Sequence, residues 1–498
     1  MKTAKRITAL ILCLSILLFS TVFTVSADEA AVAGDAPFRI HVTVNGDTST
    51  ARGFSWYTKA DAPTNIELFC DGAPVEAEIS VSYSKEWEGN YMHKLTVTNL
   101  TPATTYTYRV GSEKGWSDYG TFTTNGGADD NTVNFVAIAD VQASNIENFT
   151  KGANALNAAF TMMPDADFYA NMGDFTDDST NEEWDMYDTA FAQLNLRNTI
   201  VPISGNHDGL GVENWFNNMF NLDTTESVQT SDGVNYSFDY GNAHFAVLNT
   251  NDILSISLAQ LSWLKNDLNS TDKDWKIVMM HKSPYSLGKD AKWPDALYLQ
   301  QSLTKVLDAC DVDVVFSGHD HQYLRTKKIA NNRLDDDGTV YILSGTAGAK
   351  RYEVRSFLAN HFMPTKFIDA LVIQKDGYGN YWNGTNWDCS ADTNIGSCFN
   401  CISINGGRLE MNTYILADEK DADGNDVITK VDTMVLEKAV GQNKITFTGD
   451  NTTSELEYNL SIVPSFLCLA AYTFTIWLPK FLIMAPQLIY VVITEDTF

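Results

Sequence analysis

Five apolar runs along the chain each stop at a residue that can bind a metal ion, and no other feature constrains the fold as strongly. The runs are VAIAD, YANMGD, IVPISGNHD, KIVMMH and VVFSGHDH, and they deliver Asp140, Asp174, Asn206, His281 and His319. Each run has the pattern of a buried strand that stops abruptly, in most cases beside a glycine. Ligands of open α/β sheets bind just beyond the carboxyl ends of the strands. We therefore expect five strands to bring these side chains together along one rim.

The same segments supply further polar residues. His321 completes a His-x-His pair with His319, and His207 and Asp208 follow Asn206 directly. Carboxylate and amide oxygens mixed with imidazole nitrogens suit zinc, manganese or iron. The set is large enough for two ions. The sequence therefore predicts a centre of two divalent transition-metal ions.

The order of the five segments resembles that of the calcineurin-like metallophosphoesterase superfamily. Its series reads D-x-H, G-D-x-x-D, G-N-H-D/E, a lone H and G-H-x-H. The lead ligands here are separated by 34, 32, 75 and 38 residues, and the match covers roughly residues 132–350. One position departs, because Gln142 stands where many members have a histidine. The resemblance implies an α/β (α+β) domain with two facing β-sheets flanked by helices.

The resemblance also implies roles for the ligands. Asp174 would bridge the two ions, and the neutral amide of Asn206 would leave one ion more electrophilic. Asp140 and His321 would complete the protein shell of the first ion, while Asn206, His281 and His319 would serve the second. The implied metal ligands are Asp140, Asp174, Asn206, His281, His319 and His321.

Two residues beside the ligands are implied to take part in catalysis. A hydroxide shared by the two ions would attack phosphorus. His207 would point away from the metals, toward the leaving-group oxygen, and act as general acid. Asp208 would orient its ring and favour the imidazolium.

Other residues near the motifs set the metal and substrate predictions. Purple acid phosphatases carry G-D-x-x-Y, and Asp177 replaces that tyrosine here, so we expect no ferric-tyrosinate centre. Gln142 would ligate weakly or hold a metal-bound water. Lys282, Tyr285 and Arg325 flank ligands and are candidates for contacts to phosphate or substrate, with packing roles as the alternative.

Residues 37–125 read as an all-β module. Alternating runs at 38–44, 51–57 and 106–110 are separated by turn signals. The stretch LTPATTYTYRVG at 100–111 resembles the end of a fibronectin type III sandwich, which a tyrosine corner closes. Such a module ahead of a metallophosphoesterase domain resembles the N-terminal domain of purple acid phosphatases. A passive spacer is the simpler interpretation, and a substrate-binding role is the alternative.

A second domain is expected at residues 132–448, after a Gly/Asp/Asn-rich linker at 124–131. Strand patterns alternate with helical spacing, for example at 146–161 and 258–268, as in α/β proteins. Residues 339–345 read as a strand followed by the tight turn Thr-Ala-Gly beside the site.

An insertion is expected at about 355–402. Its aromatic part at about 377–401 would be either a rim of the active site or a surface loop held by a disulfide. Strand patterns return at 408–416 and 444–448.

The two ends of the chain carry further apolar runs. Basic residues, the run 7–25 and a small-residue cleavage site predict a signal peptide at 1–27, with an uncleaved anchor as the alternative. We therefore expect a secreted or cell-surface protein. The segment 461–493 is apolar but interrupted by prolines, and its longest clean stretch, 465–478, is shorter than the roughly 20 residues of a spanning helix. A membrane anchor, an aggregation-prone tail and an aberrant chain end all remain open.

The chain is strongly acidic. Its formal charge is −29, and removing the three basic residues of the leader would make it −32. This charge argues against binding to the backbone of duplex nucleic acid or to anionic membranes, since both reward a basic surface. A phosphorylated substrate would be repelled unless bound cations invert the local field.

Cysteines offer a further local prediction. Cys389, Cys398 and Cys401 lie close together in sequence. Export permits disulfides, so one bridge is expected in this cluster. A zinc site is the weaker alternative, because three thiols have no nearby histidine.

Together these features predict a dimetal phosphoesterase of the purple-acid-phosphatase-like branch. Phosphomonoesters are the expected substrates, with nucleotides or phosphodiesters as alternatives. A non-catalytic surface adhesin with a degenerate metal domain is a different class of protein, and the His207–Asp208 pair argues against it. A protein phosphatase would share the metal chemistry, but a secretory signal weighs against it.

Overall fold

The computed structural model describes residues 36–439 with internal gaps. The signal peptide, the strand at 444–448 and the apolar segment 461–493 lie outside the described residues and stay predictions. The gaps are 128–129, 210–213, 229, 231–232, 253–254, 289–293, 353–362, 364, 376–377, 383–386 and 389–395.

The N-terminal module is a β-sandwich around its own core. Its second sheet has the order β4-β3-β7-β8, and β9 pairs with β7. The Tyr106 hydroxyl accepts the backbone N–H of Thr101 at 2.9 Å, which forms the predicted tyrosine corner. The strands of this sheet are β4 (Ala73–Val75), β3 (Asn65–Cys70), β7 (Thr105–Ser112), β8 (Gly115–Trp116) and β9 (Gly120–Thr123).

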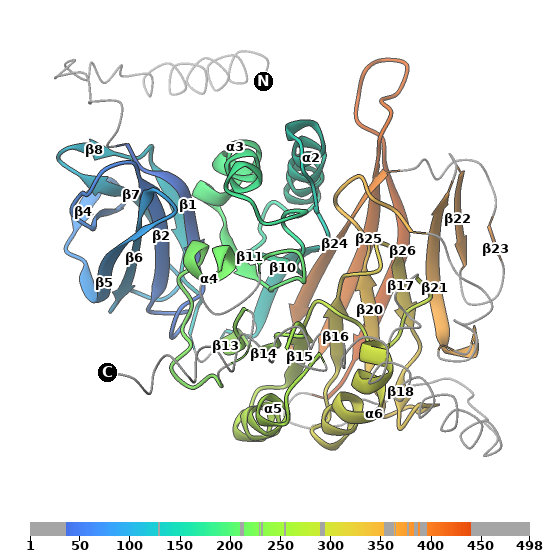
Figure 1. The fold of residues 1–498 in the computed structure, drawn as a ribbon. Coiled ribbons are helices and arrows are strands. Elements are labelled where there is room, and N and C mark those ends of the chain that lie inside the picture. Colours follow the sequence, from blue (N-terminus) through green and yellow to red (C-terminus); the bar gives the residue numbers. More distant parts are fainter. Residues whose placement is uncertain are drawn as a thin grey trace, which may run out of the picture.

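The first sheet of the module continues without a break into the second domain. Strand β1 pairs in parallel with β12, with Val42 opposite Thr199. The result is a ten-stranded sheet that runs across both domains (Figure 1). Its strands in order are β26 (Ile428–Glu437), β25 (Arg408–Ala417), β24 (Gly396–Asn405), β10 (Thr132–Ile138), β11 (Phe168–Asn171), β12 (Thr199–Pro202), β1 (Phe38–Thr43), β2 (Arg52–Thr58), β6 (Asn90–Thr98) and β5 (Glu78–Trp87).

A nine-stranded sheet faces the part of the long sheet that belongs to the second domain, from β26 to β12. Side chains of β10 and β11 meet those of β14, β15 and β16 in one apolar core, which includes Phe135, Phe168 and Phe245. The two facing sheets of the prediction are therefore confirmed. The strands are β13 (Tyr236–Tyr240), β14 (Ala243–Val247), β15 (Trp275–Met279), β16 (Val314–Ser317), β20 (Val340–Ser344), β17 (Tyr323–Thr326), β21 (Ile368–Lys375), β22 (Tyr378–Trp382) and β23 (Trp387–Asp388).

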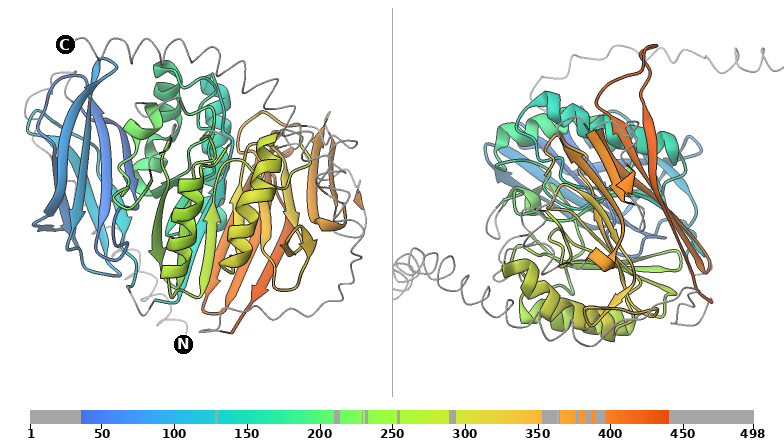
Figure 2. Two further views of the ribbon diagram at one scale, coloured as in Figure 1. Left: turned by 60° about the horizontal axis from the view of Figure 1, so that its bottom comes forward. Right: turned by 90° about the vertical axis from the view of Figure 1, so that its right-hand side faces the viewer.

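Helices cover the outer face of each sheet, as both views in Figure 2 show. Helices α2 (Ile146–Met162) and α3 (Asn181–Arg197) pack on the long sheet, and α5 (Leu258–Ser270) and α6 (Pro294–Ala309) pack on the other. Helix α3 begins with a capping box, in which Thr180 and Glu183 satisfy each other's backbone N–H groups. None of the described helices is long and apolar enough to cross a membrane. The remaining elements are α4 (Trp215–Met219), the 3-10 turn Thr365–Phe367, and the hairpin β18 (Ile329–Ala330) and β19 (Arg333–Leu334).

Side chains reinforce the junction between the two domains. Arg39 is buried and its guanidinium bonds the Asp185 carboxylate at 2.5 Å and the Asn181 side chain at 2.9 Å, both on α3. Lys94 donates to the Asn217 and Phe220 carbonyls at 2.6 Å each. Because a shared sheet and buried cations join the domains, the module is fixed to its neighbour rather than hung on a linker.

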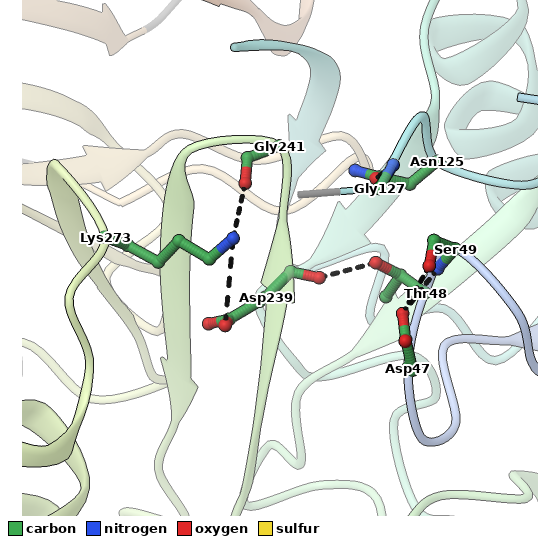
Figure 3. Close-up of a pocket in the computed structure, with 8 residues that line it drawn as sticks. All are labelled: Asp47, Thr48, Ser49, Asn125, Gly127, Asp239, Gly241 and Lys273. Carbon is green, nitrogen blue, oxygen red and sulfur yellow. Dashed lines mark hydrogen bonds and ion pairs between the residues drawn. The ribbon is translucent and has the colours of Figure 1, made fainter. Parts of the chain in front are cut away.

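A pocket of about 320 Å³ opens at another part of this junction (Figure 3). Thr48 donates to the Asp239 carbonyl at 2.5 Å, and Lys273 donates to the Gly241 carbonyl at 2.9 Å. The Asp47 carboxylate accepts from both the backbone and the hydroxyl of Ser49. These groups bond one another, so we regard the pocket as a contact between domains.

The insertion expected at about 355–402 is wrong at its end, because residues 396–402 belong to a strand of the long sheet. Residues 396–405 form β24, a central strand that pairs antiparallel with β10, from Thr132↔Asn405 to Ala137↔Asn400. Cys398 and Cys401 lie on this strand three residues apart, so they enter different cores, and both thiols are free. The expected bridge does not involve these two thiols, because alternation along a strand points them to opposite faces. Cys389 lies outside the described residues.

Candidate metal centre

The predicted ligands converge from the carboxyl ends of both sheets. Asp140, Asp174 and Asn206 follow β10, β11 and β12, which are parallel neighbours in the long sheet. His281 and His319 follow β15 and β16, parallel neighbours in the facing sheet. The two sheets therefore present their ligands at a common edge.

Five of the six side chains form two groups that share one carboxylate. The first ligand group is Asp140, Asp174 and His321, and the second is Asp174, His281 and His319. Within each group the ligand atoms lie within 4.8 Å of one another. Asp174 is thus placed to touch an ion in either group.

Asn206 joins the second ligand group. Its side-chain oxygen lies 3.1 Å from Nε2 of His281, which is itself 3.2 Å from an Asp174 carboxylate oxygen. The other nitrogen of His281, Nδ1, donates to the Met172 carbonyl at 2.7 Å. That bond turns Nε2 toward the group, as backbone acceptors commonly do for metal-binding histidines.

The backbone is strained where the ligands leave their strands. Asp140, Asp174, His319 and His321 all have positive φ, between 47° and 77°. Such conformations are unfavourable for residues with a Cβ and cluster at functional sites. Gly205 allows the loops to approach closely, because a Cβ there would lie 2.1 Å from the Asp174 nitrogen. The close packing of these loops therefore holds the four residues in backbone conformations that would otherwise be unfavourable.

The electrostatics of the groups suit cations. Burial raises the pKa of Asp140 well above its ordinary value. Burial also opposes ionisation of Asp174, but His281 and neighbouring histidines lower its pKa overall. Burial lowers the pKa of His281, and Asp174 raises it to about 9. Bound metal ions would balance the negative charge of the two carboxylates.

Gln142 gives an independent test of fit. Its amide nitrogen donates to the Asp177 carboxylate at 3.2 Å, while its buried carbonyl oxygen has no partner among the described residues. A buried acceptor without a partner costs free energy. An ion at the first ligand group, or a water bound to it, would satisfy that oxygen, which fits the expected metal centre.

His207 lies beside the ligands but in neither group. Its backbone N–H donates to the Asp174 carboxylate at 2.9 Å. Its ring Nδ1 contacts the backbone carbonyl of Asp177, which makes Nδ1 the protonated nitrogen. The side chain is 35% exposed, so a substrate can reach it.

The predicted role of Asp208 is wrong. Its buried carboxylate accepts the backbone N–H groups of Asp174 at 3.0 Å, Phe175 at 2.7 Å and Gly205 at 2.7 Å. Among the described residues these bonds go to the loop backbone and none reaches the His207 ring, because the chain turns back after Gly205, whose carbonyl accepts the Asp208 N–H. Asp208 therefore holds the ligand loops together.

Lys350 and Tyr352 were missed by the sequence analysis. The Lys350 ammonium forms an ion pair with Asp177, and its carbonyl accepts Nδ1–H of His321 at 3.0 Å. The Tyr352 ring stacks on His321 with centroids 4.1 Å apart. Their only sequence signal is position, just after the Thr-Ala-Gly turn that was placed beside the site.

Two of the suggested substrate contacts are wrong. The Tyr285 hydroxyl donates to Asn332 at 2.6 Å, and its buried ring packs on Tyr341. Arg325 is buried in ion pairs with Asp369 and Asp432. The Tyr285 hydroxyl and the Arg325 guanidinium are both bonded to other parts of the fold, as the packing alternative expected.

Lys282 lies closer to the site. It follows His281 directly, and its charge contributes to the lowered pKa of His319. Its ammonium pairs with the Asp295 carboxylate on α6 at 3.0 Å. Lys282 therefore ties α6 to the loop that carries His281.

Comparison with known proteins agrees with this geometry. Residues 133–323 match the family of calcineurin-like phosphoesterases, and residues 37–124 match the N-terminal domain of purple acid phosphatases. Purple acid phosphatase 15 of Arabidopsis thaliana is 28% identical over 243 residues, which cover 46% of this chain and 44% of that protein. Purple acid phosphatase 22 of the same plant is 26% identical, and the match covers 46% of this chain and 56% of that protein.

More distant relatives extend the match. Acid phosphatase type 7 of Danio rerio is 23% identical, with 64% of this chain and 80% of that protein covered. The solved structure of PhoD superimposes with a TM-score of 0.57 at 13% identity, over 89% of this chain and 99% of that one, which shows a similar fold. The chain spans about half the length of the two plant relatives.

Proposed function

We propose that this chain, which carries a calcineurin-like phosphoesterase domain behind a purple acid phosphatase N-terminal domain, is a metal-dependent hydrolase of phosphate monoesters. The observation that carries the proposal is the shared carboxylate. Asp174 belongs to both ligand groups; the first adds one acid and one histidine, and the second adds two histidines. Two ions about 3.5–4 Å apart with a common carboxylate suit the clamping of a phosphoryl group.

The bound ions would neutralise the phosphoryl oxygens and lower the pKa of a water molecule. The chain itself fixes the positions of the ligands. Asp208 holds the loops of Asp174 and Gly205 together from below. Hydrogen bonds from His281 to the Met172 carbonyl and from His321 to the Lys350 carbonyl set which ring nitrogen faces the centre.

His207 is the proposed proton donor to the leaving group. Its Nδ1–H is engaged by the Asp177 carbonyl, so Nε2 is the nitrogen available to a substrate. The Asp177 carboxylate also lies near this ring, 3.8 Å from Nδ1. A proton held at Nε2 can pass to the departing alkoxide oxygen, which a poor leaving group requires.

We infer that the catalytic domain extends beyond the matched residues to β26. Strand β24 pairs with β10, which carries Asp140, and β25 and β26 continue that edge. Removal of these strands would expose the β10 edge and the core behind it. This supports a domain of residues 132–448, with the N-terminal module at 37–125.

The test is metal content and turnover of Asp174→Asn. Wild-type protein should carry close to two transition-metal ions and hydrolyse p-nitrophenyl phosphate with Mn²⁺ or Zn²⁺. Asp174→Asn should lose metal from both sites, whereas the exposed Asp272→Asn should behave as wild type. Wild-type protein with no bound metal and no turnover under any of these conditions would refute the proposal. A panel of mono- and diesters, including nucleotides, separates the substrate alternatives.

A further inference from the structure

A pocket of about 450 Å³ opens beside His207, and both domains line it. Asn206, which belongs to the second ligand group, lines the same pocket. The part of an ester that extends away from the metal centre past His207 would therefore enter this space. The lining residues are Trp87, Glu88, Asp177, Asp178, Ser179, Asn206, His207, Gly209, Asn214 and Trp215.

The N-terminal module contributes its wall through a tight turn. Strands β5 and β6 are joined at Glu88 and Gly89, both with positive φ of 50° and 71°, between the paired residues Trp87 and Asn90. Such two-residue turns favour positive φ at both central positions. Trp87 meets the Trp215 ring edge-on with centroids 5.9 Å apart. The turn is thereby held against α4, at the rim of the catalytic domain.

The facing wall is built from the loop after Asp174. The backbone N–H of Asp178 donates to Glu183 at 2.8 Å, and the same carboxylate caps α3. This bond fixes the loop that presents Asp177 and Asp178. Lys350 forms an ion pair with Asp177 and offsets its negative charge. Glu88 and Asp178 are the two acidic lining residues that Lys350 does not neutralise.

The pocket is acidic and aromatic. Its described lining residues include three carboxylates and two indoles but neither lysine nor arginine. The Lys85 ammonium lies 5.3 Å from the Trp87 ring centroid, so this indole already accepts a cation on its face. An anionic leaving group would be repelled here, and an ammonium group would be attracted by both the rings and the carboxylates.

We propose that this pocket is the leaving-group site and that it selects phosphate monoesters of short amino alcohols. The ammonium group would lie between Trp87 and Glu88 while the ester oxygen lies near His207. The N-terminal module is then part of the substrate site rather than a spacer. This inference rests on the proposed hydrolase function, and its test includes a measurement that does not depend on turnover.

The first experiment compares three esters that differ only at the end of a two-carbon alcohol. They are 2-aminoethyl phosphate, ethyl phosphate and phosphoglycolate, which end in an ammonium, a methyl and a carboxylate group. Wild-type kcat/KM should be highest for the aminoethyl ester and lowest for phosphoglycolate. An order that places phosphoglycolate first would overturn the proposal.

The second experiment changes the pocket. In Glu88→Gln the ratio of kcat/KM for the aminoethyl ester to that for the ethyl ester should fall by about two- to fivefold, the size of one exposed charge contact. Trp87→Leu should lower the same ratio. The control is Glu86→Gln, an exposed acid on β5 that does not line the pocket, and it should keep the wild-type ratio. An unchanged ratio in both pocket variants would refute the proposal.

Binding separates failure of this site from failure of the hydrolase function. Phosphonates resist hydrolysis, so 2-aminoethylphosphonate and ethylphosphonate can be titrated by calorimetry into Mn²⁺-loaded protein. The aminoethyl compound should bind more tightly, and Glu88→Gln should remove most of the difference. Tighter binding without turnover of any ester would uphold the pocket and refute the hydrolase function. Equal binding of the two phosphonates would refute the pocket even if esters are hydrolysed.

Discussion

The Asp208 carboxylate accepts the backbone N–H of Asp174 at 3.0 Å, so the residue that follows His207 supports the carboxylate shared by both ligand groups rather than the His207 ring. The same carboxylate accepts the N–H groups of Phe175 and Gly205. The geometry of two loops, one after β11 and one after β12, thus depends on one buried side chain. A backbone N–H left without an acceptor in this position would cost free energy.

We predict that Asp208→Asn weakens the whole centre. An asparagine offers one acceptor oxygen and turns a donor toward N–H groups, so the free energy of unfolding should fall by about 1–3 kcal/mol. The thermal unfolding temperature of metal-free protein and the metal content should both be lower than in wild type. Turnover should fall equally for good and poor leaving groups. Asp272→Asn is the control. Unchanged stability with a loss confined to poor leaving groups would restore the orienting role.

His207→Ala should lower turnover while metal content stays near that of wild type. The ring is in neither ligand group, and its Nδ1–H is bonded to the Asp177 carbonyl. The loss should approach the 10²–10⁴-fold typical of general acid catalysis for alkyl phosphates and be smaller for p-nitrophenyl phosphate. The measurement is the rate ratio of wild type to variant on both substrates. An equal loss on both, together with lost metal, would show that His207 is a ligand.

The sequence was sufficient to predict which acidic and histidine side chains lie together, because their signal is local. Each lies where an apolar run stops, and strand ends of facing sheets meet without further information. The Asp208 contact could not be predicted, because it depends on how the chain turns after Gly205. Strand β24 was not predicted because Cys and Asn residues interrupt its apolar pattern. Its partner β10 also lies more than 250 residues earlier in the chain.

Other misses share that cause. Arg325 was judged by its distance in sequence from His321, yet its partners Asp369 and Asp432 come from strands far along the chain. The pairing of β1 with β12 is likewise a contact between domains, and no pattern within either strand indicates it. The approach of Trp87 to His207 follows from that pairing. Tertiary contacts of this kind decide which polar residues face the site.

The Lys350–Asp177 pair leads to a prediction about charge balance. In Lys350→Met the Asp177 carboxylate would face an incoming phosphate without its cation. We expect kcat/KM to fall by about two- to fivefold, the range of a partly exposed ion pair. The double variant Lys350→Met/Asp177→Asn should recover much of the loss, and the exposed Lys305→Met should have no effect. A double variant no better than the single one would assign Lys350 a direct contact to substrate.

Absorption spectra test the absence of a phenolate ligand. Asp177 occupies the place of the tyrosine and is engaged by Lys350 and by the Gln142 amide. Iron-loaded protein should therefore lack a tyrosinate charge-transfer band in the visible range. A purple preparation would contradict this and would point to Tyr352, whose ring lies against His321. Loss of the colour in Tyr352→Phe would then identify the ligand.

The last prediction concerns stability against pH and a histidine far from the centre. His244 donates from both ring nitrogens, to Asp239 and to Asp267, at 2.8 Å each. Burial lowers its pKa, but the two carboxylates raise it overall to about 9. Because the folded pKa lies above the unfolded value near 6.5, the stabilisation is fully present below about pH 6.5. It is lost as the pH rises through about 9.

The size of this effect should be about 1–3 kcal/mol, since one pKa unit corresponds to about 1.4 kcal/mol and part of the shift is lost to relaxation. Chemical unfolding of metal-free protein at several pH values between 6 and 10 measures it. His244→Gln should remove that part of the pH dependence and should be less stable than wild type mainly at low pH. Burial lowers the pKa of His41 to about 3, so this histidine is neutral throughout this pH range. The control is a substitution of His41, which should leave the dependence of stability on pH above pH 7 unchanged. If wild type and His244→Gln lose stability in parallel above pH 7, the imidazolium between Asp239 and Asp267 does not contribute.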